Sequence, residues 1–260
     1  MMYKRKQNGN TIGLVLILIV IVGLIVFALM RVLQKDSVDS ESATKSNDSV
    51  TQGQEPADEL SLKNLGLATL GSIDVTSNAL REYDSRGLKG LYIFGEGLEG
   101  GRINPNFEFA SLKENTEVVS AVDGVVVNIK DQQESNDKEV FIQTFDGSIW
   151  IIGYDHIVDL KVSKGDKVKA GDVIGNPARQ NNGLLRFEIQ INKKNEDGSE
   201  VHVCPTSVLD KSVESTILNE LNNVLAEWES VSGKDLYADS QDPTGCLETA
   251  LSPAQAEGRN

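Results

Sequence analysis

Residues 161–175 read KVSKGDKVKAGDVIG, and this stretch decides the fold that the sequence predicts. Its second half, VKAGDV at residues 168–173, resembles VSAVDGV at residues 119–125, which lies 49 residues earlier. In each copy a valine and an alanine precede a turn made of glycine and aspartate. Two like half-units that close one sheet account for such a repeat, so the stretch predicts a mainly β domain built from two similar halves.

Short β segments surround this repeat. Residues 118–127 predict a strand, a turn and a second strand, and residues 139–145 and 148–154 predict two more strands on either side of an Asp146-Gly147 turn. Residues 184–191 alternate strictly, with Leu185, Phe187 and Ile189 on one face and polar side chains on the other. Several short strands with glycine and aspartate turns favour a sandwich or barrel over βαβ units.

Helices are expected only at the edges of this β region. Residues 206–230 carry an apolar stripe at helical spacing and predict a helix that docks on the sheet. Residues 75–83 predict a short helix, and the chain from Gly233 onward reads as loop with a frayed end at 252–260.

The N-terminal part reads as a membrane anchor. Residues 12–30 form an uncharged apolar run of 19 residues, which as a helix spans about 28 Å, close to the hydrocarbon thickness of a bilayer. No small-residue cleavage signal follows it, which favours a retained signal anchor over a removed leader. We therefore divide the chain into a short cytoplasmic N-terminus (1–11), a transmembrane anchor (12–33), an acidic, Ser-rich linker (34–58), a β domain (59–210, core 104–210) and a C-terminal helix and tail (211–260).

Charge limits the partners. The 260 residues carry a formal net charge of −14, which argues against nucleic-acid binding because that requires clustered Lys and Arg. The acidic linker suits the outer side of the membrane. We expect a single-pass protein of the cell membrane with a cytoplasmic N-terminus and an extracytoplasmic C-terminal domain.

Four motifs carry a family resemblance. VSAVDGVV at 119–126, YDHI at 154–157, the opening stretch at 161–175 and LRFE at 185–188 occur in this order and spacing. Together they resemble peptidase family M23, the LytM-like peptidoglycan endopeptidases, over residues 107–210. The resemblance implies a barrel-sandwich hybrid β domain and, in the family, zinc-dependent cell-wall hydrolysis.

The chemical positions depart from the family pattern. Asn104 stands where the family has a histidine ligand, and Glu108 stands where it has an aspartate ligand. In the last motif Leu184 replaces the catalytic histidine and Arg186 replaces a ligand histidine, so His156 is the family histidine that remains. A guanidinium has no lone pair for a metal, so we expect Arg186 either to pair with Glu108 in place of a zinc ion or to be a solvent-facing strand residue.

These departures predict a binding or scaffolding module without a cofactor. Its groove is expected to be lined by Asn104, Glu108, Tyr154, His156, Arg186 and Glu188, with His156 sharing a strand face with Tyr154 and Trp150. Cell-wall peptide or glycan and an envelope protein are the expected partners. An active zinc endopeptidase with atypical ligands, in which His156 is the candidate catalytic residue, and an adaptor of an envelope-spanning assembly remain alternatives.

Cys204 and Cys246 are the two cysteines of the chain. On the oxidising side of a membrane they predict a disulfide that closes a loop of roughly 42 residues and stabilises the fold by about 4 kcal/mol. His202, two residues before Cys204, leaves a His-x-Cys metal pair as a further possibility, but additional ligands are lacking.

Overall fold

The computed structural model describes residues 59–76 and 89–258. These residues belong to one compact unit, Glu55–Asn260. Buried apolar residues of the described chain pack into one hydrophobic core within this unit. The anchor predicted for residues 12–33 lies outside the described residues, and among those described there is no helix with the length and apolarity to cross a bilayer. The short helix predicted for residues 75–83 lies almost entirely outside them as well, and Val75 and Thr76 are not helical.

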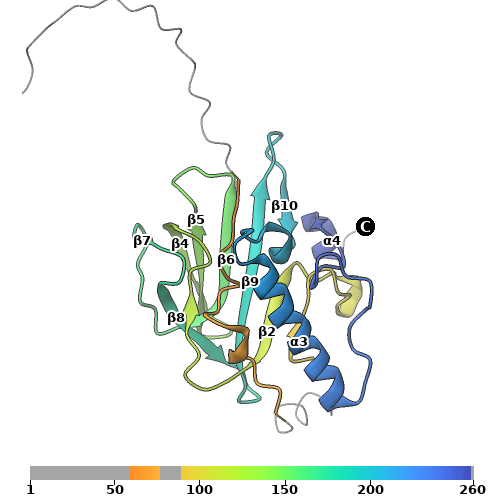
Figure 1. Ribbon diagram of the computed structural model, residues 1–260. Coiled ribbons are helices and arrows are strands. Elements are labelled where there is room, and N and C mark those ends of the chain that lie inside the picture. The colour runs from red at the N-terminus through yellow and green to blue at the C-terminus, as the bar shows by residue number, and fades with distance from the viewer. Residues whose placement is uncertain (1–58, 77–88, 259–260) are drawn as a thin grey trace, which may run out of the picture. The chain divides into compact units, whose positions relative to one another are not determined.

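Antiparallel strands dominate the described chain (Figure 1). The strands are β1 (Leu91–Tyr92), β2 (Asn106–Leu112), β3 (Val118–Val119), β4 (Gly124–Gln132), β5 (Asp137–Gln143), β6 (Trp150–Val158), β7 (Lys167–Val168), β8 (Val173–Arg179), β9 (Leu185–Lys194), β10 (Glu200–Val203) and β11 (Ala250–Leu251). The helices are α3 (Glu214–Ser232) and α4 (Pro253–Ala256), with short 3-10 turns at η1 (Leu70–Ser72), η2 (Glu99–Gly101) and η3 (Pro205–Val208).

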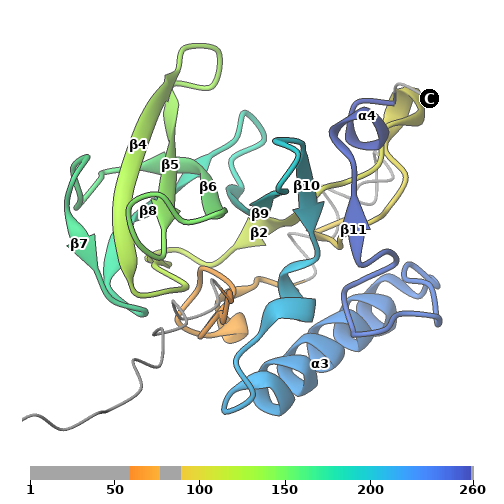
Figure 2. The same ribbon diagram turned by 90° about the horizontal axis from the view of Figure 1, so that it is seen from above.

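The sheet runs in the order β1-β2-β9-β8-β6-β5-β4-β7, and β10 adds to β9 and carries β11. β6 pairs with β5, β8 and β9, so the sheet folds back on itself, and the view from above shows β4, β5, β6 and β8 curling around one another (Figure 2). The prediction of a mainly β fold with a C-terminal helix is confirmed.

Alternation on β9 builds the core as predicted. Phe187 and Ile189 are fully buried, and Phe187 stacks between Phe109 and Tyr154, with ring centroids 5.8 and 6.3 Å apart. Because successive side chains of a strand point to opposite faces, this packing sends Arg186 and Glu188 to the other face of β9. Burial of one face of β9 therefore places the polar side chains of the site on its opposite face.

Residues 118–127 form a strand, a turn and a strand, as predicted. The two strands do not pair with each other, because β3 pairs with β8 and β4 pairs with β5 and β7. One local prediction needs correction. The tail after Gly233 is not all loop, because β11 pairs with β10 and Ser252 caps α4 through a capping box with Gln255.

The C-terminal helix begins later than predicted, at Glu214 and not at Thr206. Residues 205–208 form η3, and the Asp210 carboxylate then accepts the Ser212 N–H at 2.9 Å, which turns the chain into the helix. The helix ends at Gly233, whose φ of 67° suits glycine and whose N–H donates to Glu229 at 2.8 Å. Trp228 is fully buried against Gly90, where a Cβ would lie 1.8 Å from the indole.

Candidate functional site

Two neighbouring strands hold the polar face of the site. β2 and β9 are paired so that Glu108 lies opposite Glu188 and Asn106 lies opposite Gln190. Directly opposite residues of an antiparallel pair present their side chains on the same face, about 5 Å apart at Cβ. Two carboxylates and two amides are therefore brought together by register alone.

Arg186 lies between the two carboxylates. Its Nε is 2.9 Å from Glu108 Oε1, and its terminal Nη2 donates to Glu188. The Nε–H does not point at the Glu108 oxygen, and this nitrogen has no hydrogen-bond partner among the described residues, so the contact with Glu108 is an ion pair without hydrogen-bond geometry. The Arg186–Glu108 pair predicted from the sequence is present.

His156 reaches the same site because β6 contains a bulge. Lys138 pairs with Ile157 and Val140 pairs with Tyr154, so two residues of β6 lie opposite one residue of β5. His156 adopts a φ of 61°, in the left-handed region. This extra residue breaks the alternation, so the prediction that His156 shares a face with Tyr154 and Trp150 is wrong. Tyr154 and Trp150 point into the core, and His156 points toward Glu188.

The imidazole of His156 has acidic neighbours at both nitrogens. Nδ1 lies 2.7 Å from Asp137 Oδ2, and Nε2 lies 3.4 Å from Glu188 Oε1 and 3.9 Å from Asp155 Oδ2. Asp137 is itself held by the Ser135 hydroxyl, which donates to its other oxygen at 2.6 Å. The ring is thus oriented by buried carboxylates on both sides.

Sequence reasoning missed Asp137 and Asp155. With His156 they form a group whose potential metal-ligating atoms all lie within 4.8 Å of one another. Asp137 ends the polar run QQESND (132–137), which is typical of an exposed turn, yet its side chain is only 3% exposed. Asp155 sits in the YDHI motif, and its place in the site follows from the pairing that puts it opposite Glu188 on β9.

Burial and charge set the protonation states. Burial raises the pKa of Glu108 to about 7, with a further rise from the Glu188 carboxylate that Arg186 opposes. Burial by itself lowers the pKa of His156, but the hydrogen bond to Glu188 and the Asp155 and Asp137 carboxylates outweigh it and raise the pKa to about 9. Burial acts to raise the pKa of Glu188 too, and its contacts with His156 and Arg186 outweigh that and hold the pKa below its usual range.

Two residues predicted to line the groove have their polar groups bound to backbone, although Asn104 does line a cavity at the site. The Asn104 amide donates to the Ile93 and Asn106 carbonyl oxygens at 3.0 Å each and accepts the Asn106 N–H at 3.2 Å, so its hydrogen-bonding groups are occupied by backbone. Tyr154 is fully buried, its hydroxyl accepts the Ala121 N–H at 2.8 Å, and burial raises its pKa to about 12. Glu108, His156, Arg186 and Glu188, also predicted to line the groove, lie together at the site.

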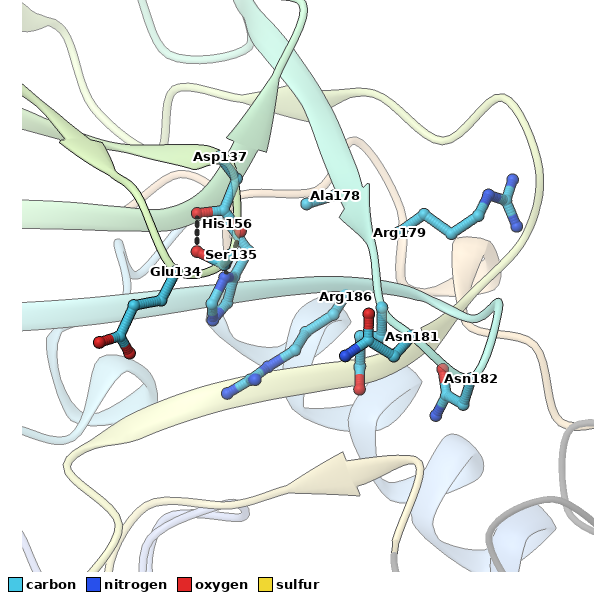
Figure 3. Close-up of a pocket in the computed structure, with 10 residues that line it drawn as sticks. Glu134, Ser135, Asp137, His156, Ala178, Arg179, Asn181, Asn182 and Arg186 are labelled. Carbon is cyan, nitrogen blue, oxygen red and sulfur yellow. Dashed lines mark hydrogen bonds and ion pairs between the residues drawn. The ribbon is translucent and has the colours of Figure 1, made fainter.

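The site opens into two adjoining cavities. One, of about 760 Å³, lies over β2 and β9 with residues 97–102 and 256–257 as a further wall. The other, of about 380 Å³, lies between His156 and the β8–β9 turn (Figure 3). Arg186 and Gln180 line both. Figure 3 shows Arg186 and His156 extending into the same space, with Asn181 and Asn182 at its other end.

The cysteine predictions have a clear outcome. Cys204 and Cys246 form a disulfide with Cα atoms 5.9 Å apart, as predicted. Cys204 is therefore unavailable to a His-x-Cys metal pair, and His202 Nδ1 lies 2.8 Å from the Asn192 side-chain oxygen. His202 lines the larger cavity.

Comparison with known proteins places the middle of the chain in a family. The family model described as "Peptidase family M23" matches residues 108–198. A comparison with curated proteins gives no match.

Several solved structures are similar to parts of this chain at low identity. The solution structure of lysostaphin is 20% identical with a TM-score of 0.35, over 40% of this chain and 43% of that one. The catalytic domain of the prophage-encoded M23 protein EnpA from Enterococcus faecalis is 20% identical with a TM-score of 0.35, over 44% and 88%. A chain of the SpoIIQ–SpoIIIAH pore-forming complex is 17% identical with a TM-score of 0.40, over 60% and 96%. This chain thus spans less than half of the lysostaphin chain that it matches. Residues 108–198 form a domain of peptidase family M23.

Proposed function

We propose that this chain is a membrane-anchored, extracytoplasmic protein whose M23 domain binds a cell-wall component or an envelope protein and does not hydrolyse peptides with zinc. One observation carries the proposal. At the position where the family resemblance calls for a histidine ligand, the Arg186 guanidinium contacts both Glu108 and Glu188. A permanent cation there supplies the positive charge that the two carboxylates require.

Three further family positions do not fit a zinc ion either. Zinc needs neutral imidazole, thiolate or carboxylate ligands with free lone pairs. The Asn104 amide is bonded to backbone, Glu108 is paired with Arg186, and Leu184 has no ligand atom. A zinc ion, with two positive charges, would be repelled at short range by the positive charge of the guanidinium. We therefore derive no catalytic step through zinc.

A second candidate function has its own supporting observation. Asp137, Asp155 and His156 place three ligand atoms close together, which favours a metal-dependent hydrolase with atypical ligands. Against it, His156 Nδ1 is already engaged by Asp137, and its Nε2 faces Glu188. The third candidate, an adaptor of an envelope-spanning assembly, predicts a stable oligomer of the full chain.

The extracytoplasmic location is part of the proposal. It rests on the apolar run at residues 12–30, the acidic linker at 34–58 and the Cys204–Cys246 disulfide, since structural disulfides persist mainly in oxidising compartments.

Zinc stoichiometry tests the proposal. Residues 55–260 are purified, dialysed against trace zinc and analysed by elemental mass spectrometry. We expect close to zero zinc per chain. A matched variant that restores the family histidines, Asn104→His, Leu184→His and Arg186→His, is expected to bind close to one. One zinc per wild-type chain would contradict the proposal, and cell-wall digestion with His156→Ala as control would then test the hydrolase.

A further inference from the structure

A hollow of about 730 Å³ lies apart from the groove, and none of its lining residues lines either of the two groove cavities. Its floor is the start of β4, which lies between β7 and β5 in the sheet (Figure 2). Gly124 and Val125 of β4 pair with Val168 and Lys167 of β7, and the two valines give the hollow apolar walls. A partner in this hollow contacts no residue that lines the groove.

Phe145 projects beside this hollow. It is 51% exposed, the most exposed of the large apolar side chains that the structure describes. The turn that carries it is held by Gln143, whose amide nitrogen donates to the Ser148 carbonyl oxygen at 2.9 Å and whose amide oxygen accepts the Gly147 N–H at 3.3 Å. An aromatic ring on a hydrogen-bonded turn loses little conformational freedom when it becomes buried, which favours its use as a contact with a partner.

Two of the three aspartates that line the hollow are engaged within the fold. Asp123 accepts the Ala170 N–H at 2.9 Å and lies 3.3 Å from Lys169 Nζ. Asp172 accepts the Lys169 N–H at 2.8 Å. These contacts hold the turn at residues 169–172 against the turn at residue 123, so the two carboxylates serve the shape of the hollow.

The remaining charged groups of the lining are one lysine and one aspartate. Lys167 lies on β7, and Asp146 follows Phe145 in the turn after β5, so β4 separates the two. Two strand spacings amount to roughly 10 Å. Within the part of the chain that the structure describes, neither side chain forms a salt bridge. A cation and an anion on opposite sides of a hollow are complementary to the same surface turned by 180°.

We propose that two copies of this chain associate through this surface about a two-fold axis over β4. Lys167 of each copy then faces Asp146 of the other, and each Phe145 ring enters the hollow of the other beside Val168. A second copy fits better than an anionic bilayer, because three aspartates against two lysines leave the lining without excess positive charge. This inference goes beyond the proposed binding function, and the proposed membrane anchor would raise the effective concentration of the two copies.

Sedimentation velocity of residues 55–260 at about 10 µM to 1 mM tests the inference. The surface is small, so we expect a monomer–dimer equilibrium with a dissociation constant in the micromolar to sub-millimolar range. Phe145→Ser is expected to weaken the dimer by at least about tenfold. Val231→Ser is the matched control, because Val231 is a 46% exposed apolar residue on α3, and it is expected to leave the equilibrium unchanged.

Charge reversal identifies the contact between the copies. Asp146→Lys and Lys167→Asp are each expected to weaken the dimer by about tenfold, because each variant places like charges opposite one another. The double variant restores opposite charges and is expected to return to within about threefold of the wild type. A loss caused by local distortion of the turn or of β7 would not be rescued in this way. Circular dichroism of each variant verifies that the domain is folded.

Three results would overturn the inference: a monomer at every concentration, a dimer that Phe145→Ser leaves unchanged, or charge reversals that the double variant does not rescue. Binding of monomers to vesicles of phosphatidylcholine and phosphatidylglycerol, abolished by Phe145→Ser, would assign the surface to the bilayer and overturn it too. All of these results leave the zinc measurement and the proposed function untouched. One zinc per chain removes the proposed function and leaves the dimer to be decided by sedimentation.

Discussion

At the scale of single residues, the site depends on one guanidinium that faces two buried carboxylates. Arg186 is 29% exposed at its side chain, and Glu108 and Glu188 are more buried than Arg186. A buried ion pair adds little net stability over apolar packing, but removing one partner is costly because the remaining charges lose their compensation. Burial raises the pKa of Glu108, and repulsion from the Glu188 carboxylate raises it further.

Replacing Arg186 with alanine is expected to destabilise the domain by about 2 kcal/mol at pH 8, because Glu108 and Glu188 then lie buried and adjacent without a cation. Urea unfolding of residues 55–260 measures the change as a lower midpoint. Arg179→Ala, which removes the exposed pair with Glu114, is the control and is expected to cost less than about 0.5 kcal/mol. Equal midpoints for the wild type and Arg186→Ala would show that the pair is energetically irrelevant.

The same variant should respond to pH. Glu108 has a pKa raised from 4.5 to about 7 in the folded state, so its stabilising protonation is complete below pH 4.5 and is lost as pH rises through 7. Arg186 acts to lower the pKa of Glu108, so removing Arg186 makes the stability that is lost between pH 4.5 and pH 8 larger. The deficit of Arg186→Ala relative to wild type is therefore expected to be smaller at pH 4.5 than at pH 8.

At the scale of elements, the repeated stretches at 119–125 and 168–173 form two half-units that interlock. β3 of the first half pairs with β8 of the second, and β7 of the second pairs with β4 of the first. Ser120 and the Gly171-Asp172 turn exchange backbone hydrogen bonds at 2.8 and 2.9 Å. The repeat in the sequence thus becomes pairing between the halves, and each half completes the sheet of the other.

Gly124, at the first residue of β4, is the close-packed point of this arrangement. A Cβ at Gly124 would lie 2.3 Å from the Gln143 carbonyl oxygen and 2.8 Å from Ile142 Cγ2, so β4 and β5 would have to separate. We expect Gly124→Ala to cost about 1–3 kcal/mol, measured by the urea midpoint. Gly97→Ala, where a Cβ meets nothing within 4 Å, should change the midpoint little. Similar midpoints for the two variants would contradict this close approach.

At the scale of the whole described domain, the C-terminal segment completes the wall of the larger cavity. Cys246 is bonded to Cys204, and Leu247 donates its N–H to Phe94 at 3.0 Å. The chain then forms β11 on β10 and reaches residues 256–257, which line the cavity together with residues 97–102. The disulfide therefore fixes the segment that leads to this wall.

Reduction of the disulfide is expected to lower the stability of residues 55–260 by about 4 kcal/mol, because an unfolded chain without a crosslink over 42 residues gains conformational entropy. Urea unfolding with and without reductant measures the shift, with free thiols verified by titration. The Cys204→Ala, Cys246→Ala double variant should not respond to reductant. An unchanged midpoint in a protein shown to be reduced would contradict the expectation.

The candidate site was predictable only in part. Glu108 and Arg186 were found because the family pattern aligns both of them with ligand positions, and their pairing followed from charge. Asp137 was missed because it lies in a polar run that resembles a solvated turn. The predicted orientation of His156 was wrong because strand alternation does not account for the extra residue of a bulge. Asn104 lines the larger cavity, but its amide, like the buried Tyr154 hydroxyl, is bound to backbone.

The sequence by itself determined the β class, the M23 domain, the core face of β9 and the cysteine pair. Local alternation, turn residues and motif spacing indicate these features, and all three can be read directly from the linear sequence. The tertiary structure alone decided that β3 and β4 pair with other strands, that His156 turns away from Tyr154, and that Asp137 joins the site. Those features depend on register and burial between segments far apart in sequence, where a shift of one residue moves a side chain from the core to the groove.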